Sequence, residues 1–119
     1  MEVARLSRIA PEVPVSSLKE AVEFYEQKLG FGLGMQMPDY AIVERDDIAI
    51  HLFKDETRRH SPVGIHIFTG NLELLFSELR SRGADLSQEI MLKPWGNRDF
   101  RIQDNSGNVI KFTEPRQMP

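Results

Sequence analysis

Two amphipathic segments, each followed by a group of short alternating segments, constrain the fold of this chain more than any other feature of its sequence. In residues 17–31, SLKEAVEFYEQKLGF, apolar side chains recur every three or four positions and so share one face of a helix. Residues 71–85, NLELLFSELRSRGAD, have the same spacing, with Leu72 at the position that Leu18 has in the first segment. The sequence therefore predicts two helices in equivalent places of an internal repeat.

Both predicted helices are bounded by residues that favour helix ends. Ser16 or Ser17 can accept a hydrogen bond from the free backbone amides at the start of the first helix, and Asn71 can do so for the second. Gly30 and Gly83 follow the last apolar positions, where a left-handed residue commonly ends a helix. These residues place the helix ends close to the limits of the apolar pattern.

Short segments with alternating or β-branched residues fill much of the remaining chain and are typical of strands. Residues common in turns, such as those at 37–39, 94–96 and 104–107, separate them. We expect a strand before the first helix and further strands at 34–37, 40–45, 48–53, 64–68, 90–92, 99–103 and 108–113.

The order strand, helix, strand, strand, strand occurs twice. It defines two βαβββ modules, residues 1–57 and 62–115, within a single domain of residues 1–119. One such module is too small to bury its own sheet, so the modules must pair, within one chain or across two. The expected fold is α+β, a curved arrangement of eight strands around a concave space with both helices outside.

Alternation within the last strand of each module divides its side chains between two faces. Ile50, Leu52 and Phe112 are expected to pack beneath the helices. His51 and Lys111 alternate with these residues and are expected on the concave side, at matching places in the two modules. There they are either solvated linings of a wide groove or contacts for an anionic or hydrogen-bonding group of a ligand.

Composition argues against several classes of function. Apolar residues make up 40% and charged residues 28% of the 119 positions, as in ordinary globular domains. The chain has no cysteine, which removes disulfides, thiolate metal sites and thiol nucleophiles. A net charge of −3 without a clustered basic face argues against nucleic acid as a partner.

The chain also lacks signals for membranes or secretion. No apolar run is long enough to span a bilayer, and the first residues do not form a secretory signal, so a cytoplasmic protein without a membrane partner is expected. The basic run Arg58-Arg59-His60 follows Asp55 and Glu56 and is interpreted as a solvated loop. Motifs for covalent catalysis or for nucleotide binding are absent from the sequence.

Five short motifs in order cover nearly the whole chain: AVEFY at 21–25, LGF at 29–31, RDDI at 45–48, PWG at 94–96 and FRIQDNSGN at 100–108. With these motifs the chain resembles the vicinal oxygen chelate superfamily, which contains glyoxalases, bleomycin resistance proteins and dioxygenases. The RDD and PWG motifs resemble the bleomycin resistance branch in particular. The resemblance implies a homodimer, with Pro11 as the hinge for exchange of the first strand between subunits.

Catalytic members of this superfamily hold a divalent metal with one side chain from each of four strands. The resemblance assigns these positions to Ala10, His51, Gly64 and Lys111, of which only His51 can bind a metal. A lysine ammonium has no lone pair and would stand where the cation belongs. We therefore expect no catalytic residue, no metal and no cofactor.

A different metal site is the open alternative. Glu12 and His66 lie two residues beyond Ala10 and Gly64, on the same strand faces, and could join His51. Such a site would support the second functional hypothesis, a metal-dependent lyase, transferase or dioxygenase of the same superfamily.

The resemblance also implies a ligand site. Members of the resistance branch bind their drug in a crevice at the dimer interface and stack aromatic rings on its flat heteroaromatic part. The implied ligand-binding residues are Trp95, Tyr40, Gly96, Asp39, His51, Lys111 and Met37. The implied function is non-catalytic binding and sequestration of a bleomycin-like antibiotic, and thereby antibiotic resistance. A binder of another metabolite is the further alternative.

Several of these residues also have plainer interpretations. Trp95 is either a ring presented to the groove or a plug that packs a loop onto the sheet, and Met37 is either groove wall or core. Bleomycin-type ligands carry a cationic tail, which Asp39 and Glu44 would attract. Arg98 and Arg101 would repel that tail if they face the groove.

Overall fold

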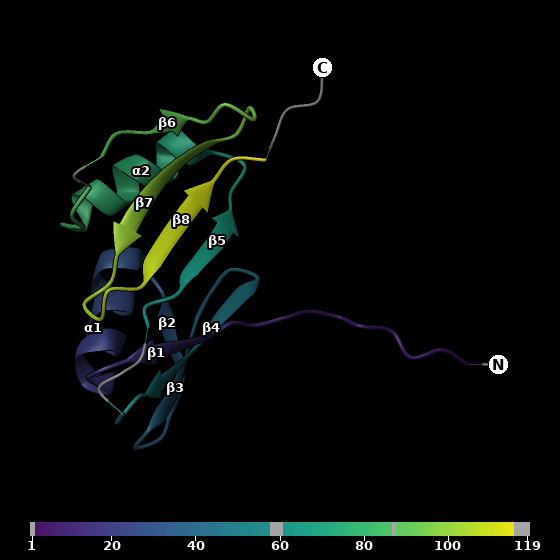
Figure 1. Ribbon diagram of the computed structural model, residues 1–119, viewed down its shortest axis with the longest axis vertical. Coiled ribbons are helices and arrows are strands. Elements are labelled where there is room, and N and C mark those ends of the chain that lie inside the picture. The colour runs from purple at the N-terminus through teal and green to yellow at the C-terminus, as the bar shows by residue number, and fades with distance from the viewer. Residues whose placement is uncertain (1, 58–60, 87, 116–119) are drawn as a thin grey trace.

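A computed structural model describes residues 2–57, 61–86 and 88–115 (Figure 1). Residues 58–60, interpreted above as a solvated loop, lie outside the described residues. The first half contains β1 (Glu12–Val15), α1 (Leu18–Leu29), β2 (Gly32–Gln36), β3 (Tyr40–Arg45) and β4 (Ile48–Lys54). The second contains β5 (Gly64–Phe68), α2 (Leu72–Ser81), β6 (Met91–Leu92), β7 (Arg98–Gln103) and β8 (Val109–Thr113).

The two halves have the same sheet topology. One four-stranded sheet has the order β1-β4-β3-β2 and the other has the order β5-β8-β7-β6. The first strand of each half runs parallel to the last, and all other neighbours are antiparallel. The expected α+β fold of two βαβββ units is therefore confirmed. The largest error in a strand limit is at β2, which begins at Gly32 rather than at residue 34.

Both helices lie on the same side of the two sheets, and the opposite side carries no helix (Figure 1). Each helix buries its apolar stripe in a core shared with the sheets. The buried stripes consist of Leu18, Ala21, Val22, Tyr25 and Leu29 in α1, and of Leu72, Phe76 and Leu79 in α2. Residues before β1 run away from the body as an extended segment (Figure 1).

The helix ends follow the capping residues of the sequence. The Ser17 hydroxyl accepts from the backbone amide of Glu20 at 3.3 Å, and the Asn71 side chain accepts from that of Leu74 at 3.1 Å. Gly30 ends α1 with a φ of 75°, and Gly83 follows α2 with a φ of 81°. A side chain on either glycine would strain the backbone, which explains the residue type.

A buried polar cluster joins the two halves. The Tyr25 hydroxyl, on α1, donates to Oδ2 of Asp104 at 2.9 Å in the turn between β7 and β8. Asn108 donates from Nδ2 to the same oxygen at 3.0 Å and to the carbonyl of Pro14, in β1, at 2.7 Å. Its Oδ1 accepts from the backbone amide of Val63 at 2.9 Å. The motif at residues 104–108 is thus a structural link between the halves.

An ion-paired clamp provides a second link. Arg45, at the end of β3, donates to both carboxylate oxygens of Glu78 on α2, at 2.6 and 2.9 Å, and to the carbonyl of Leu29 at 2.8 Å. Arg82 also binds Glu78, at 2.8 Å. These hydrogen bonds, chiefly those from Arg45, hold the pKa of Glu78 below its ordinary value. The arginine of the RDD motif therefore acts here as a contact between the halves.

Within the described residues, no helix is long and apolar enough to cross a membrane.

Candidate functional site

Each sheet has one face packed against the helices and one face free of them. The first open face, on the β1–β4 sheet, carries Glu12, Tyr40, Ile42, Glu44, His51 and Phe53. The second open face, on the β5–β8 sheet, carries His66, Phe68, Asp99, Arg101 and Lys111. Ile50 and Phe112 are buried on the opposite sides, whereas His51 and Lys111 are half-buried on the open faces, as alternation predicts.

A hydrogen-bonded group occupies the first open face. The Tyr40 hydroxyl donates to Oε2 of Glu12 at 2.9 Å and lies 2.7 Å from Nδ1 of His51. Because the hydroxyl has one hydrogen, a bond donated to Glu12 makes Nδ1 of His51 the donor to the Tyr40 oxygen. Desolvation, followed by the bond to Glu12 and the charge of that carboxylate, raises the pKa of Tyr40. Tyr40 is therefore held in place and neutral at ordinary pH.

A cavity of about 320 Å³ lies on the second open face, and we call it the Trp95 cavity. It is lined by His66, Phe68, Trp95, Asn97, Asp99, Arg101, Lys111 and Thr113. Trp95 is 61% exposed, so it does not plug the loop onto the sheet but presents its ring at the edge of this cavity. Trp95 and Lys111, both predicted from the sequence, are brought together here.

The turn that presents Trp95 depends on the glycine that follows it. Gly96 has a φ of 98°, and its backbone amide donates to the carbonyl of Lys93 at 2.9 Å. A left-handed conformation of this kind favours glycine. Gly96 itself borders a different cavity, with Leu92 and Arg98 among its neighbours. Gly96 thus shapes the turn and does not line the Trp95 cavity.

The remaining predicted ligand residues lie apart from Trp95. Met37 is 53% exposed in the turn between β2 and β3, where its amide donates to the carbonyl of Tyr40 at 2.7 Å. Asp39 is exposed in the same turn. Tyr40 and His51 lie on the first sheet beside this turn, and none of the four residues Met37, Asp39, Tyr40 and His51 lines the Trp95 cavity. A single chain therefore holds the predicted residues in two separate groups.

The two arginines considered for the groove behave differently. Arg98 points to the helix side, where it binds both carboxylate oxygens of Glu114, at 2.7 and 2.9 Å, and Glu73 of α2 at 2.7 Å. Arg101 is exposed and lines the Trp95 cavity. The groove-facing arrangement considered for Arg98 is therefore wrong. Arg98 shares a strand face with the buried Phe100, and the same alternation would have placed it correctly.

Three of the four positions that the resemblance assigned to metal ligands, Ala10, Gly64 and Lys111, carry side chains that cannot bind a metal, and His51 is the fourth. Ala10 precedes β1, and Gly64 pairs with Val109 at the start of β5; their methyl and hydrogen side chains offer no donor atom. Lys111 offers an ammonium group. The alternative set is not assembled either, because Glu12 and His51 are on the first sheet while His66 is on the second, 3.1 Å from the Thr113 hydroxyl. Across residues 2–57, 61–86 and 88–115, no three His, Cys, Asp or Glu side chains form a metal-binding group.

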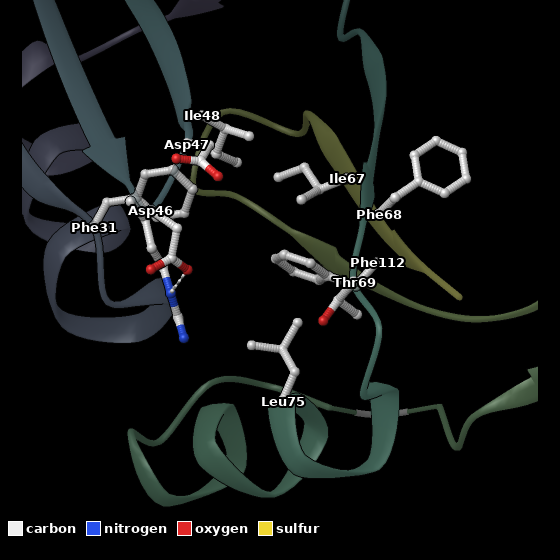
Figure 2. A pocket seen from close by; sticks show the side chains of 10 residues that line it. Phe31, Asp46, Asp47, Ile48, Ile67, Phe68, Thr69, Leu75 and Phe112 are labelled. Atoms are coloured by element: carbon white, nitrogen blue, oxygen red, sulfur yellow. Dashed lines mark ion pairs between the residues drawn. The ribbon is translucent and has the colours of Figure 1, made fainter. Parts of the chain in front are cut away.

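The junction between the two sheets contains hollows that the sequence did not predict. A cleft of about 510 Å³ lies between β4 and β5, and we call it the junction cleft. It is lined by Ile9, Ala10, Pro11, Ile48, Ala49, Ile50, Ile65, His66, Ile67 and Phe68. A smaller pocket of about 200 Å³ lies beside it, where Ile67, Phe112 and Leu75 face Phe31 and Ile48, with Asp46 and Asp47 at its rim (Figure 2).

Phe68 is the main residue that sequence reasoning missed. It is 61% exposed, lines both the Trp95 cavity and the junction cleft, and stacks on His66 with ring centres 6.2 Å apart. Alternation from His66 places it on the open face, which is the signal that could have identified it.

A comparison with protein families identifies the superfamily of this chain. The model of the Glyoxalase/Bleomycin resistance protein/Dioxygenase superfamily matches residues 5–112. The chain belongs to this superfamily. Among curated superfamily members, the bleomycin resistance protein of Geobacillus stearothermophilus is 27% identical over 122 residues, covering 86% of this chain and 92% of the relative.

Solved structures of other proteins have the same fold. The bleomycin resistance determinant encoded on the transposon Tn5 matches with a TM-score of 0.83 at 18% identity, covering 95% of this chain and all of that one. The bleomycin-binding protein of bleomycin-producing Streptomyces verticillus, solved with copper(II)-bleomycin, matches with a TM-score of 0.76 at 23% identity. That match covers 96% of this chain and 100% of the other.

Proposed function

We propose that this superfamily member binds a planar small molecule on the open faces of its sheets and sequesters it without chemical change. The observation that carries the proposal is the exposed ring of Trp95 at the edge of a cavity on the second open face. A tryptophan buries a large area on a flat ligand and loses little conformational freedom when it does so. The relatives' names indicate antibiotics of the bleomycin type as the ligand class.

A second copy of the chain would complete the groove. Tyr40 and Trp95 are on different sheets of one chain, so a ligand that contacts both needs the first open face of one protomer opposite the second open face of its partner. Val3, Leu6 and Ile9 of the extended N-terminal segment are 85–95% exposed and supply apolar surface for such an association. In this homodimer, Pro11 is the pivot from which residues 2–10 reach the partner.

Sequestration needs affinity but no catalytic group. Ala10, Gly64 and Lys111 at the superfamily's metal positions support this non-catalytic function, because none of them can bind a Lewis-acidic metal. A cytoplasmic binder present in excess over the drug lowers the free drug concentration by mass action alone.

A bleomycin titration monitored by tryptophan fluorescence tests the proposal, since Trp95 is the only tryptophan. We expect saturable quenching or a shift of its emission. By calorimetry, Trp95→Ala should weaken binding more than about tenfold, as truncation of a central aromatic contact usually does. Trp95→Phe, the matched control, keeps a ring and should retain most of the affinity. Unchanged emission at saturating drug, with equal affinity in Trp95→Ala, would refute the stacking role.

A further inference from the structure

We propose that the Trp95 cavity is a site for a planar ring that carries an acidic group, such as an aromatic carboxylate or sulfonate. The inference rests on the proposed stacking at Trp95 and adds the charge that the ligand carries at this end of the groove. It concerns the second open face only.

Two cations provide the charge. Arg101 and Lys111 are directly paired in the register of β7 and β8, so their side chains leave the sheet on the same side. Both line the Trp95 cavity. In the part of the chain that the structure describes, neither side chain has an ion-pair or hydrogen-bond partner. Two neighbouring cations without an anion between them attract an acidic ligand group.

The other polar groups of the cavity are already paired. Asp99, its only carboxylate, is 4% exposed and lies 3.7 Å from Nζ of Lys93. Asn97 donates from Nδ2 to the carbonyl of Glu114 at 2.9 Å. Because Lys93 balances the charge of Asp99, the cavity keeps the positive charge of Arg101 and Lys111.

The apolar walls fix where the ring lies. Trp95 and Phe68 are each 61% exposed at this cavity, and an aromatic ligand would cover both. The volume of about 320 Å³ is at the lower end of the range for small-molecule sites and suits a ligand of about two rings. Such a ring against Trp95 directs its acidic substituent to Lys111 and Arg101, where each ammonium or guanidinium donates a charge-assisted bond.

The first open face has the opposite charge, which separates the two ends of the proposed groove. Glu12 and Glu44 lie on this face, whereas Arg45 and Lys54, the basic residues of its described strands, alternate onto the opposite face. A cationic tail of a bleomycin-type ligand would therefore lie toward Glu12 and Glu44 of the facing protomer and away from Lys111. The chain's net charge of −3 does not reveal this division.

Three naphthalene probes whose substituent at the same position is anionic, neutral or cationic test the inference on the full chain: 2-naphthoate, 2-naphthamide and 2-naphthylmethylammonium, each measured by calorimetry. We expect the naphthoate to bind about tenfold more tightly than the amide, because one charge-assisted contact is worth about that factor. The ammonium compound should bind most weakly. The preference for the naphthoate should shrink as salt is added.

Substitutions at Lys111 identify the source of the preference. Lys111→Met keeps the length of the side chain and should bring the naphthoate and the amide to within about threefold of each other, with the amide affinity retained. Lys111→Arg keeps the charge and should keep the preference. Lys19→Met removes an exposed charge on the helix side and serves as the matched control.

The outcomes separate this inference from the proposed function. If all three probes bind equally well and lose affinity in Trp95→Ala, the charge preference is wrong while the stacking site stands. If no probe binds, or if Trp95→Ala leaves every affinity unchanged, both proposals fail.

Discussion

Asn108 illustrates how one side chain can link the two halves of this fold. Three groups depend on it: the carbonyl of Pro14, the carboxylate of Asp104 and the backbone amide of Val63. The side chain is 2% exposed, so water cannot replace these bonds without a rearrangement. Residues 104–108 of the FRIQDNSGN motif therefore have a structural explanation in this chain, independent of any ligand.

Replacing Asn108 should destabilise the protein strongly. Asn108→Ala leaves buried polar partners unsatisfied, and we expect a loss of about 2–4 kcal/mol in the free energy of unfolding. Urea denaturation followed by circular dichroism measures it. Asn105→Ala, an exposed position of the same turn, should change stability by less than about 0.5 kcal/mol. Equal stability of the two variants would show that the buried cluster does not hold the halves together.

The sequence was least informative about the exposure and the hydrogen-bond partners of single site residues. The Pro-Trp-Gly turn identified Trp95, but its exposure depends on how the turn between β6 and β7 sits on the sheet, which no local pattern specifies. Tyr40 was predicted as a stacking ring, whereas its hydrogen bonds to Glu12 and His51 depend on strands that are distant in sequence. Long-range pairing of this kind is not encoded in spacing.

At the scale of elements, the sequence predicted most of the architecture. Helix limits follow from apolar spacing and from capping by Ser17 and Asn71, which are local signals. Strand limits follow from alternation, and they are least accurate where glycine interrupts the pattern, at Gly32 and Gly34 of β2. The contact between β3 and α2 through Arg45 and Glu78 could not be predicted, because it joins elements of different halves.

The clamp between Arg45 and Glu78 predicts a pH dependence of stability. The folded-state pKa of Glu78 is lowered, so its stabilisation is present above the ordinary carboxyl pKa and is lost as the pH falls through the lowered value. We expect the free energy of unfolding to fall between about pH 5 and about pH 3, and to fall less in Glu78→Gln.

Denaturation in urea across that pH range provides the measurement. Arg45→Met should reduce the slope as Glu78→Gln does, because it removes the main donor to the carboxylate. Lys19→Met, which changes an exposed charge away from the clamp, should keep the wild-type slope. A Glu78→Gln slope equal to that of the wild type would mean that the clamp contributes nothing to acid sensitivity.

For the whole molecule, the distribution of charge and apolar surface matters more than their totals. The net charge of −3 conceals an acidic first open face and a basic second one. The apolar fraction likewise conceals the junction cleft and the exposed Val3, Leu6 and Ile9 of the N-terminal segment. The charged faces arise from strand pairing within each half, the cleft from the packing of the two halves, and the exposed apolar residues from the path of the N-terminal segment, so composition could not predict them.

The exposed N-terminal segment leads to a prediction about assembly. If residues 2–10 reach a second copy, the full chain should have twice the monomer mass by size-exclusion chromatography with light scattering. Removing residues 2–10 should weaken the dimer.

The double variant Val3→Ser, Leu6→Ser should weaken the dimer as well, because the deletion and the double variant each remove exposed apolar area that the partner would cover. Arg5→Gln, in the same segment, is the control. A monomer at all concentrations would contradict the proposed dimer groove.

Sequestration without chemistry is the central claim, and equilibrium dialysis of the purified full chain against bleomycin, followed by mass spectrometry of the recovered drug, tests it most directly. We predict that the protein retains the drug in a stoichiometric amount and that the drug is released on denaturation with its mass unchanged. A drug that is not retained, or that is recovered with an altered mass, would contradict the account.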